Sequence, residues 1–96
     1  MATRKAKKTR LRLRLYVAGS APNSLCAIAN TKAICDKHFA SGHELEIVDL
    51  IEHPRRALAD GIIVTPTLLK LLPLPVERVV GNLSDVDKVL LLLASK

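Results

Sequence analysis

Residues 10–17 read Arg-Leu-Arg-Leu-Arg-Leu-Tyr-Val. Leucine or valine alternates there with charged or amphipathic side chains, which predicts a β-strand with one buried face. A turn of small residues follows at 18–23, and Asn23 or Ser24 is expected to cap a helix over 24–39. That helix is predicted because a mostly apolar stripe recurs every three or four residues, at Leu25, Ile28, Thr31, Cys35 and Phe39.

The following segment completes a strand–helix–strand unit. Residues 44–50 alternate at first and then become apolar at Val48 and Leu50, as expected of a strand that is covered on both faces at one end. Two strands that flank a helix imply a right-handed parallel crossover. A short helix is predicted over 54–61, with Leu58 as its buried contact. Its solvent-facing positions are expected to be Arg55, Arg56 and Asp60.

The C-terminal half predicts a hairpin and a last helix. Thr65-Pro66-Thr67 precedes a strand over 68–72, because a proline suits a turn or the first position of a strand. Pro73-Leu74-Pro75 then forces an extended turn before a strand at 78–80, which Gly81 ends. Residues 84–87 match a capping box, and the helix predicted over 86–94 has no breaker and is dense in leucine.

The predicted order is therefore β-α-β-α-β-β-α, in a mixed four-stranded α/β sheet with helices on both faces. Composition agrees with one small domain, because the chain has 96 residues and 49% of them are apolar. Tyr16 and Phe39 are its only large aromatic residues, so the core must be aliphatic. The longest apolar run, at 89–94, falls far short of the roughly 20 residues that a bilayer span requires.

Charge divides the chain into an arm and a body. Residues 1–14 hold seven basic groups and no acid, whereas the remainder holds eight basic and nine acidic groups. We expect a basic, disordered arm over 1–9 and a single domain over 10–96. The arm either keeps the protein soluble or binds nucleic acid, but the stacking aromatics and basic stripe of most nucleic-acid binders are not evident. It also lacks the apolar segment of a signal peptide, so a cytoplasmic protein is expected.

The two cysteines, Cys26 and Cys35, are expected to stay unpaired. Nine residues along a helix place them on opposite faces and roughly 13 Å apart along the axis. A disulfide needs Cα atoms within about 7 Å. Cys35 could share a metal with His38 and His43, but ligands at such mixed spacing are a weak signal, and a buried thiol is the simpler interpretation. Neither a metal nor a cofactor is therefore predicted.

This order of elements, with a proline before the third strand, resembles thioredoxin. The Trp-Cys-Gly-Pro-Cys of that family corresponds to Gly19-Ser20-Ala21-Pro22-Asn23, in which Pro22 is retained. Ser20 and Asn23 replace the two cysteines, and neither can form a thiolate of low pKa or a mixed disulfide. The resemblance implies a thioredoxin-like fold with a cis bond before Pro66, while the two replacements remove the redox chemistry. We expect a protein that is not an enzyme and has no catalytic residue.

A closer resemblance, from about residue 11 to the end, is to the KaiB family of circadian clock proteins. The motifs are Leu15-Tyr16-Val17-Ala18-Gly19, Pro22-Asn23-Ser24, Thr65-Pro66-Thr67-Leu68 with Lys70, Pro73 and Pro75, and Gly81-Asn82-Leu83-Ser84. The resemblance implies a non-enzymatic regulator that binds the N-terminal ATPase ring of KaiC, a hexameric ATPase and autokinase, and modulates its phosphorylation state. In cyanobacterial clocks, that complex then sequesters KaiA.

The resemblance also implies a metamorphic protein. One state of KaiB is thioredoxin-like and binds partners, whereas the ground-state fold has a rearranged C-terminal half and usually forms tetramers. KaiB sequences commonly carry Gly and then Asp where this chain has Leu92 and Ala94, and both replacements favour a continuous helix. We therefore expect the thioredoxin-like state and a monomer, with the tetrameric ground state as the alternative.

Site residues follow from the resemblance. Lys70 and Arg78 are expected to contact partners. Cys26 and Glu77 stand where the family often carries basic residues, which weakens the case for KaiA as a partner. Positions expected to define the fold or its switching are Pro22, Pro66, Pro73, Pro75, Gly81, Leu92 and Ala94.

Overall fold

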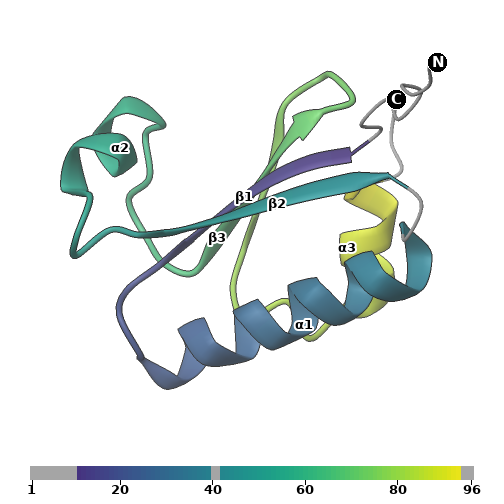
Figure 1. Ribbon diagram of the computed structural model, residues 1–96, viewed down its shortest axis with the longest axis horizontal. Coiled ribbons are helices and arrows are strands. Elements are labelled where there is room, and N and C mark those ends of the chain that lie inside the picture. Colours follow the sequence, from purple (N-terminus) through teal and green to yellow (C-terminus); the bar gives the residue numbers. More distant parts are fainter. Residues whose placement is uncertain (1–10, 40–41, 94–96) are drawn as a thin grey trace, which may run out of the picture.

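The computed structural model describes residues 11–39 and 42–93 (Figure 1). It contains, in order, β1 (Leu11–Val17), α1 (Pro22–His38), β2 (His43–Asp49), α2 (Pro54–Ala59), β3 (Thr67–Leu72), β4 (Glu77–Val80) and α3 (Val86–Leu93). The sheet order is β2-β1-β3-β4, with β1 and β2 parallel and with β3 antiparallel to β1 and to β4. The predicted order and mixed sheet are confirmed.

One face of the sheet is covered by α1 and α3 (Figure 1). Alternate residues of a strand point to the same face, and in β1 the four aliphatic ones point to this side. They are buried in the larger core cluster, which contains Leu11, Leu13, Leu15, Val17, Ala27, Ile34, Cys35, Leu68, Val79, Leu83, Val89 and Leu93. This core is aliphatic, as the composition predicts.

The opposite face carries α2, which lies over one end of the sheet (Figure 1). A smaller core cluster forms beneath it from Tyr16, Val48, Ala57 and Leu69. Val48 is buried here, and Leu50 packs against the same cluster. Both residues point to the α2 side, whereas Ile47 on the other face of β2 is 38% exposed, so the expectation that this end of β2 is covered on both faces is wrong. With α1 and α3 on one face of the sheet and α2 on the other, the prediction of helices on both faces is confirmed.

The start of α1 differs from the prediction. The helix begins at Pro22, with Ala21 as the N-cap residue, rather than after Asn23 or Ser24. Proline suits the first turn because its ring fixes φ and because an N–H at that position would have no helical partner. The Ser24 hydroxyl instead accepts a hydrogen bond from the Ala18 N–H at 3.1 Å, which ties the helix to the preceding turn.

The buried face of α1 is also rotated from the predicted one. Leu25 is exposed, whereas Ile28 and Phe39 are partly buried against the core. The fully buried residues of the helix are Ser24, Ala27, Thr31, Ile34 and Cys35. Small side chains at the first two of these positions let the helix approach the sheet, so the stripe is set by packing as well as by hydrophobicity.

Two predictions in the later helices are wrong. Leu58 is exposed, and the buried residue of α2 is Ala57. The capping box before α3 shifts by one residue, because Asp85 Oδ1 accepts a hydrogen bond from the Lys88 N–H at 3.2 Å. Asp85 is therefore the capping residue, while the Ser84 N–H donates to Asn82 Oδ1 at 3.0 Å.

The peptide bonds that precede Pro66, Pro73 and Pro75 are cis, as the resemblance implies for Pro66. Gly81 has a φ of 122°, a backbone conformation that favours glycine. Leu92 lies within α3, whereas Ala94 and the arm over 1–9 lie outside the described residues. Among the helices of 11–39 and 42–93, none is long and apolar enough to cross a membrane.

Candidate partner-binding surface

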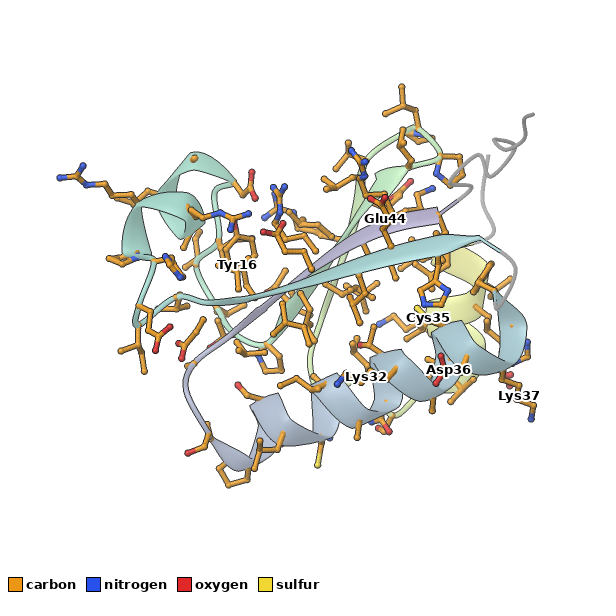
Figure 2. All side chains as sticks on the ribbon, in the orientation of Figure 1. Tyr16, Lys32, Cys35, Asp36, Lys37 and Glu44 are labelled. Carbon is orange, nitrogen blue, oxygen red and sulfur yellow. The ribbon has the colours of Figure 1, made fainter. Side chains whose placement is uncertain are left out.

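The thioredoxin cysteine positions hold no reactive group. Ser20 is exposed in the turn before α1, and Asn23 is exposed in its first turn. Cys26 is exposed, Cys35 is buried between α1 and the sheet (Figure 2), and both thiols are free, which confirms the absence of a disulfide. Burial, aided by the charge of Asp36, raises the pKa of Cys35 to about 11, so this thiol stays protonated near neutral pH.

Metal ligands are likewise not assembled. In the described part of the chain, no three side chains of His, Cys, Asp or Glu are grouped closely enough to hold an ion. His38 is exposed, and His43 Nδ1 lies 2.8 Å from the carbonyl oxygen of Phe39. The possible set of Cys35, His38 and His43 is therefore not brought together.

The connection between β2 and β3, residues 50–66, exposes several large aliphatic side chains. We call it the crossover segment. Ile63 is 92% exposed, Leu58 78%, Ile51 67% and Val64 48%. A single exposed apolar side chain is ordinary, but four on one connection of 17 residues are unusual for a surface loop. The crossover segment is therefore the strongest candidate for a binding surface.

Five polar side chains fix α2 to the sheet, and we call them the α2 cluster: Arg14 and Tyr16 of β1, Glu46 of β2, and Arg56 and Asp60 of the crossover segment. The Tyr16 hydroxyl donates to Asp60 Oδ2 at 2.6 Å and lies 2.9 Å from the Arg56 carbonyl oxygen. Figure 2 shows Tyr16 on the side of the sheet that carries α2.

Arginines complete this cluster. Arg14 donates from Nη1 to Asp60 Oδ2 and from Nε to Glu46 Oε1, at 2.9 Å in each case. Arg56 Nη1 lies 2.7 Å from Glu46 Oε2. Each carboxylate of the cluster is thus shared between two donors, and each donor set includes a residue of β1.

The hydrogen bonds shift the acid–base properties of the cluster. Those from Arg56 and Arg14 lower the pKa of Glu46 to about 2. Burial alone would raise the pKa of Asp60, but hydrogen bonds from Tyr16 and Arg14 outweigh it and lower that pKa. Burial and the Asp60 carboxylate raise the pKa of Tyr16. At neutral pH the cluster therefore holds ionised carboxylates and a protonated tyrosine.

Arg78 lies at the crossover segment, because it points to the α2 side of the sheet. Its Nη1 donates to the Gly61 carbonyl oxygen and its Nη2 to the Asp60 carbonyl oxygen, both at 3.2 Å. These contacts join β4 to the end of α2. Arg78 is itself exposed, so it borders the candidate surface.

Lys70 lies elsewhere. It pairs with Leu13 in the sheet, so its side chain points to the face covered by α1 and α3. Only 1% of the residue is exposed. This corrects the expectation of a surface lysine, because a partner could reach Lys70 only after the covering segments moved. The structure does not bring Lys70 and Arg78 to one surface.

The turn between β3 and β4 carries further exposed apolar groups. Leu74 and Val76 are exposed beside Pro73 and Pro75. On the same side of the sheet as α2, a shallow hollow of about 440 Å³ is lined by Arg12, Leu13, Arg14, Glu44, Leu45, Glu46 and Leu71. Its charged side chains pair across β1 and β2, with 2.9 Å between the paired nitrogen and oxygen atoms.

The α2 cluster is not evident from the sequence, in which Arg56 and Asp60 were expected to face solvent. One signal was available: Arg14 stands opposite Glu46 in the parallel register, so the alternating arginines of β1 and glutamates of β2 indicate cross-strand pairs. Asp60 and Tyr16 are 44 residues apart. Their contact depends on how α2 turns against the sheet, which local sequence does not determine.

Residues 14–95 match the family model of the KaiB domain. Two related proteins, both named circadian clock oscillator protein KaiB, illustrate the strength of this match. The protein of Synechococcus elongatus is 47% identical over 82% of this chain and 78% of its own length. That of Nostoc punctiforme is 45% identical over 91% of this chain and 83% of its own length.

Solved structures share the fold. The N-terminal domain of SasA from Synechococcus elongatus superposes with a TM-score of 0.73 at 24% identity, over 95% of this chain and 88% of that domain. The thioredoxin Deadhead of Drosophila melanogaster gives a TM-score of 0.74 at 13% identity, over 94% and 87% of the two chains. These likenesses confirm a thioredoxin-like architecture.

Proposed function

The chain belongs to the KaiB family of circadian clock proteins, and we propose that it is a cytoplasmic adaptor, without catalysis of its own, for a KaiC-type hexameric ATPase. It binds the ATPase ring and thereby modulates the phosphorylation state of that partner. Family membership supports the class of protein and partner. The position of the docking surface is argued from the residues of this chain.

The observation that carries the proposal is the exposed apolar crossover segment. Leu58 and Ile63 are the most exposed large hydrophobic side chains of the segment. Covering them removes apolar area from water, which is the dominant favourable contribution in most protein associations. Arg78 borders this surface and supplies a positive charge for an acidic rim on the partner.

Lys70 takes a different part in this proposal. Because it is buried on the opposite face of the sheet, it supports the conformation of β3 rather than the contact with the ring. A structural role is likewise proposed for the residues of the loops at the two ends of β3 and β4, which are Pro66, Pro73, Pro75 and Gly81. Pro22 begins α1 beside the turn at 18–21.

The free protein is proposed to rest in its partner-binding fold. Helix α3 runs without interruption to Leu93 and includes Leu92. A continuous leucine-rich helix favours this state, and hence a monomer, over a tetrameric ground-state fold with a rearranged C-terminal half. Backbone chemical shifts typical of a strand across residues 90–93 would contradict this.

KaiA is a weaker candidate for a further partner. Cys26 is exposed on α1, so it offers a thiol at a position where the family often carries a basic group. Glu77 starts β4 and brings a negative charge to another such position. A partner that binds basic side chains at these two positions would therefore bind this chain more weakly.

Size-exclusion chromatography with mass detection tests the docking surface. The protein is run alone and with an ATP-loaded KaiC-type hexamer, beside the variants Ile63→Glu and Leu74→Glu. Both substitutions place a charge at an exposed position, so both proteins should fold. Wild type and Leu74→Glu should co-elute with the hexamer, whereas Ile63→Glu should bind at least about tenfold more weakly.

Two results would contradict the proposal. A wild-type protein that does not bind the hexamer would remove the proposed partner. Equal binding by wild type and Ile63→Glu would move the contact away from the crossover segment.

A further inference from the structure

We propose that the α2 cluster positions the crossover segment for its partner, so that Arg14, Tyr16 and Asp60 set binding affinity without touching that partner. The inference rests on the proposed function. Its physical origin is that α2 is too short, and too little buried, to be held in place by packing alone.

The weak apolar hold on α2 is visible in its burial. The helix has six residues, and Ala57 is its only buried one. A helix of this length is not stable by itself in water, because it has too few backbone hydrogen bonds to offset the free-energy cost of forming its first turn. Tertiary contacts must therefore fix its position.

Three residues of the sheet fix the position of α2 through polar contacts. Tyr16 reaches both the Arg56 carbonyl oxygen and the Asp60 carboxylate, at 2.9 and 2.6 Å. Arg14 reaches the same carboxylate at 2.9 Å, and Glu46 pairs with Arg56 at 2.7 Å. The middle of the helix and its C-terminal end are thereby both fixed to β1 and β2.

The exposed side chains are linked to these anchors through the backbone. The Gly61 N–H donates to the Leu58 carbonyl oxygen at 3.1 Å, and the Ile62 N–H donates to the Ala57 carbonyl oxygen at 2.9 Å. Asp60 lies inside this tight turn. A shift of its carboxylate therefore changes the direction of Leu58 on one side and of Ile63 on the other.

Release of α2 need not unfold the protein. The larger core cluster lies on the opposite face of the sheet, against α1 and α3. Segments with few buried contacts open locally at lower free energy than the global core. If only a fraction of molecules holds the binding conformation, the apparent dissociation constant rises by the inverse of that fraction.

Two conservative variants and one matched control test this inference. Tyr16→Phe removes one oxygen, and Asp60→Asn replaces a carboxylate by a group of the same shape. The control is Arg12→Gln, because Arg12 Nε pairs with Glu44 Oε1 across the same two strands at the same 2.9 Å as Arg14 with Glu46. Hydrogen exchange and affinity for an ATP-loaded KaiC-type hexamer are measured on all four proteins.

We expect amide exchange at residues 60–62 to accelerate about tenfold in Tyr16→Phe and in Asp60→Asn, while amides of β1 and β3 keep their protection. Affinity for the hexamer should fall, mainly through slower association, by the inverse of the fraction of molecules in which exchange shows α2 still docked. Arg12→Gln should match wild type in both measurements. A merely structural cluster would change exchange throughout the sheet rather than in this segment.

Hydrogen exchange and affinity together show which part of the proposal fails. Unchanged exchange at 60–62 in both variants would overturn the role of the cluster, whatever the hexamer does. An affinity that does not follow the docked fraction measured by exchange would overturn the positioning role and leave the proposed function standing. Absence of binding by wild type would instead overturn the proposed function, and with it the binding part of this inference.

Discussion

Asp60 accepts hydrogen bonds from Tyr16 and Arg14, and both donors belong to β1. In the sequence it follows a short polar helix and has every sign of a solvent-facing residue. Its role arises because α2 returns over the sheet and brings the carboxylate to β1. A residue whose contacts lie 44 and 46 positions away cannot be assigned from its neighbours in the chain.

The depressed pKa values of Glu46 and Asp60 predict a loss of stability in acid. Both groups bind protons less readily in the folded protein than in the unfolded chain, with a pKa of about 2 for Glu46. Their stabilisation is therefore complete above the unfolded pKa and disappears as pH falls, over about pH 5 to pH 2. Urea unfolding of wild type and Glu46→Gln at several pH values should give free energies that converge across this window. Curves that stay parallel would contradict it.

The two thiols should differ sharply in reactivity. Cys26 is exposed, whereas Cys35 is buried and its pKa of about 11 keeps it protonated. Mass spectrometry after brief treatment of the native protein with iodoacetamide near neutral pH should show one modified residue per chain, at Cys26. Both should react in denaturant. Equal labelling of Cys35 in the native state would show that α1 does not pack on the sheet as described.

Among the elements, the strands were easier to predict than the helix surfaces. The alternation in β1 is strict, and the structure buries its four aliphatic residues on one face. In α1, either of two adjacent residues could face the sheet, and the small Ser24 is buried there while Leu25 is exposed. Hydrophobicity alone favours the leucine, but close approach of the helix favours the small side chain.

Helix α3 gives a prediction at the same scale. Its N-terminus is capped by Asp85 rather than by Ser84, since Asp85 Oδ1 accepts from the Lys88 N–H. Asp85→Ala should lower the free energy of unfolding by about 1 kcal/mol. Ser84→Ala keeps the Ser84 N–H that donates to Asn82, so it should change that free energy by less than about 0.5 kcal/mol. Chemical denaturation of both variants decides between the two caps, and a larger loss in Ser84→Ala would restore the sequence-based capping box.

At the scale of the whole molecule, the order of elements and the sheet type were predictable, because periodicity and turn residues mark each strand and helix. The candidate surface was not. Leu58 was expected inside and is exposed, while Lys70 was expected at the surface and is buried. Both errors have one cause, which is that the face a residue presents depends on how its element packs against the rest of the chain.

In the proposal above, the free protein already holds the fold that binds its partner. Stopped-flow mixing with increasing concentrations of an ATP-loaded KaiC-type hexamer tests it most directly. We expect a single association phase whose observed rate rises linearly with hexamer concentration, because no rearrangement precedes binding. An observed rate that levels off at a slow, concentration-independent value would contradict the claim, since a change of fold would then come first.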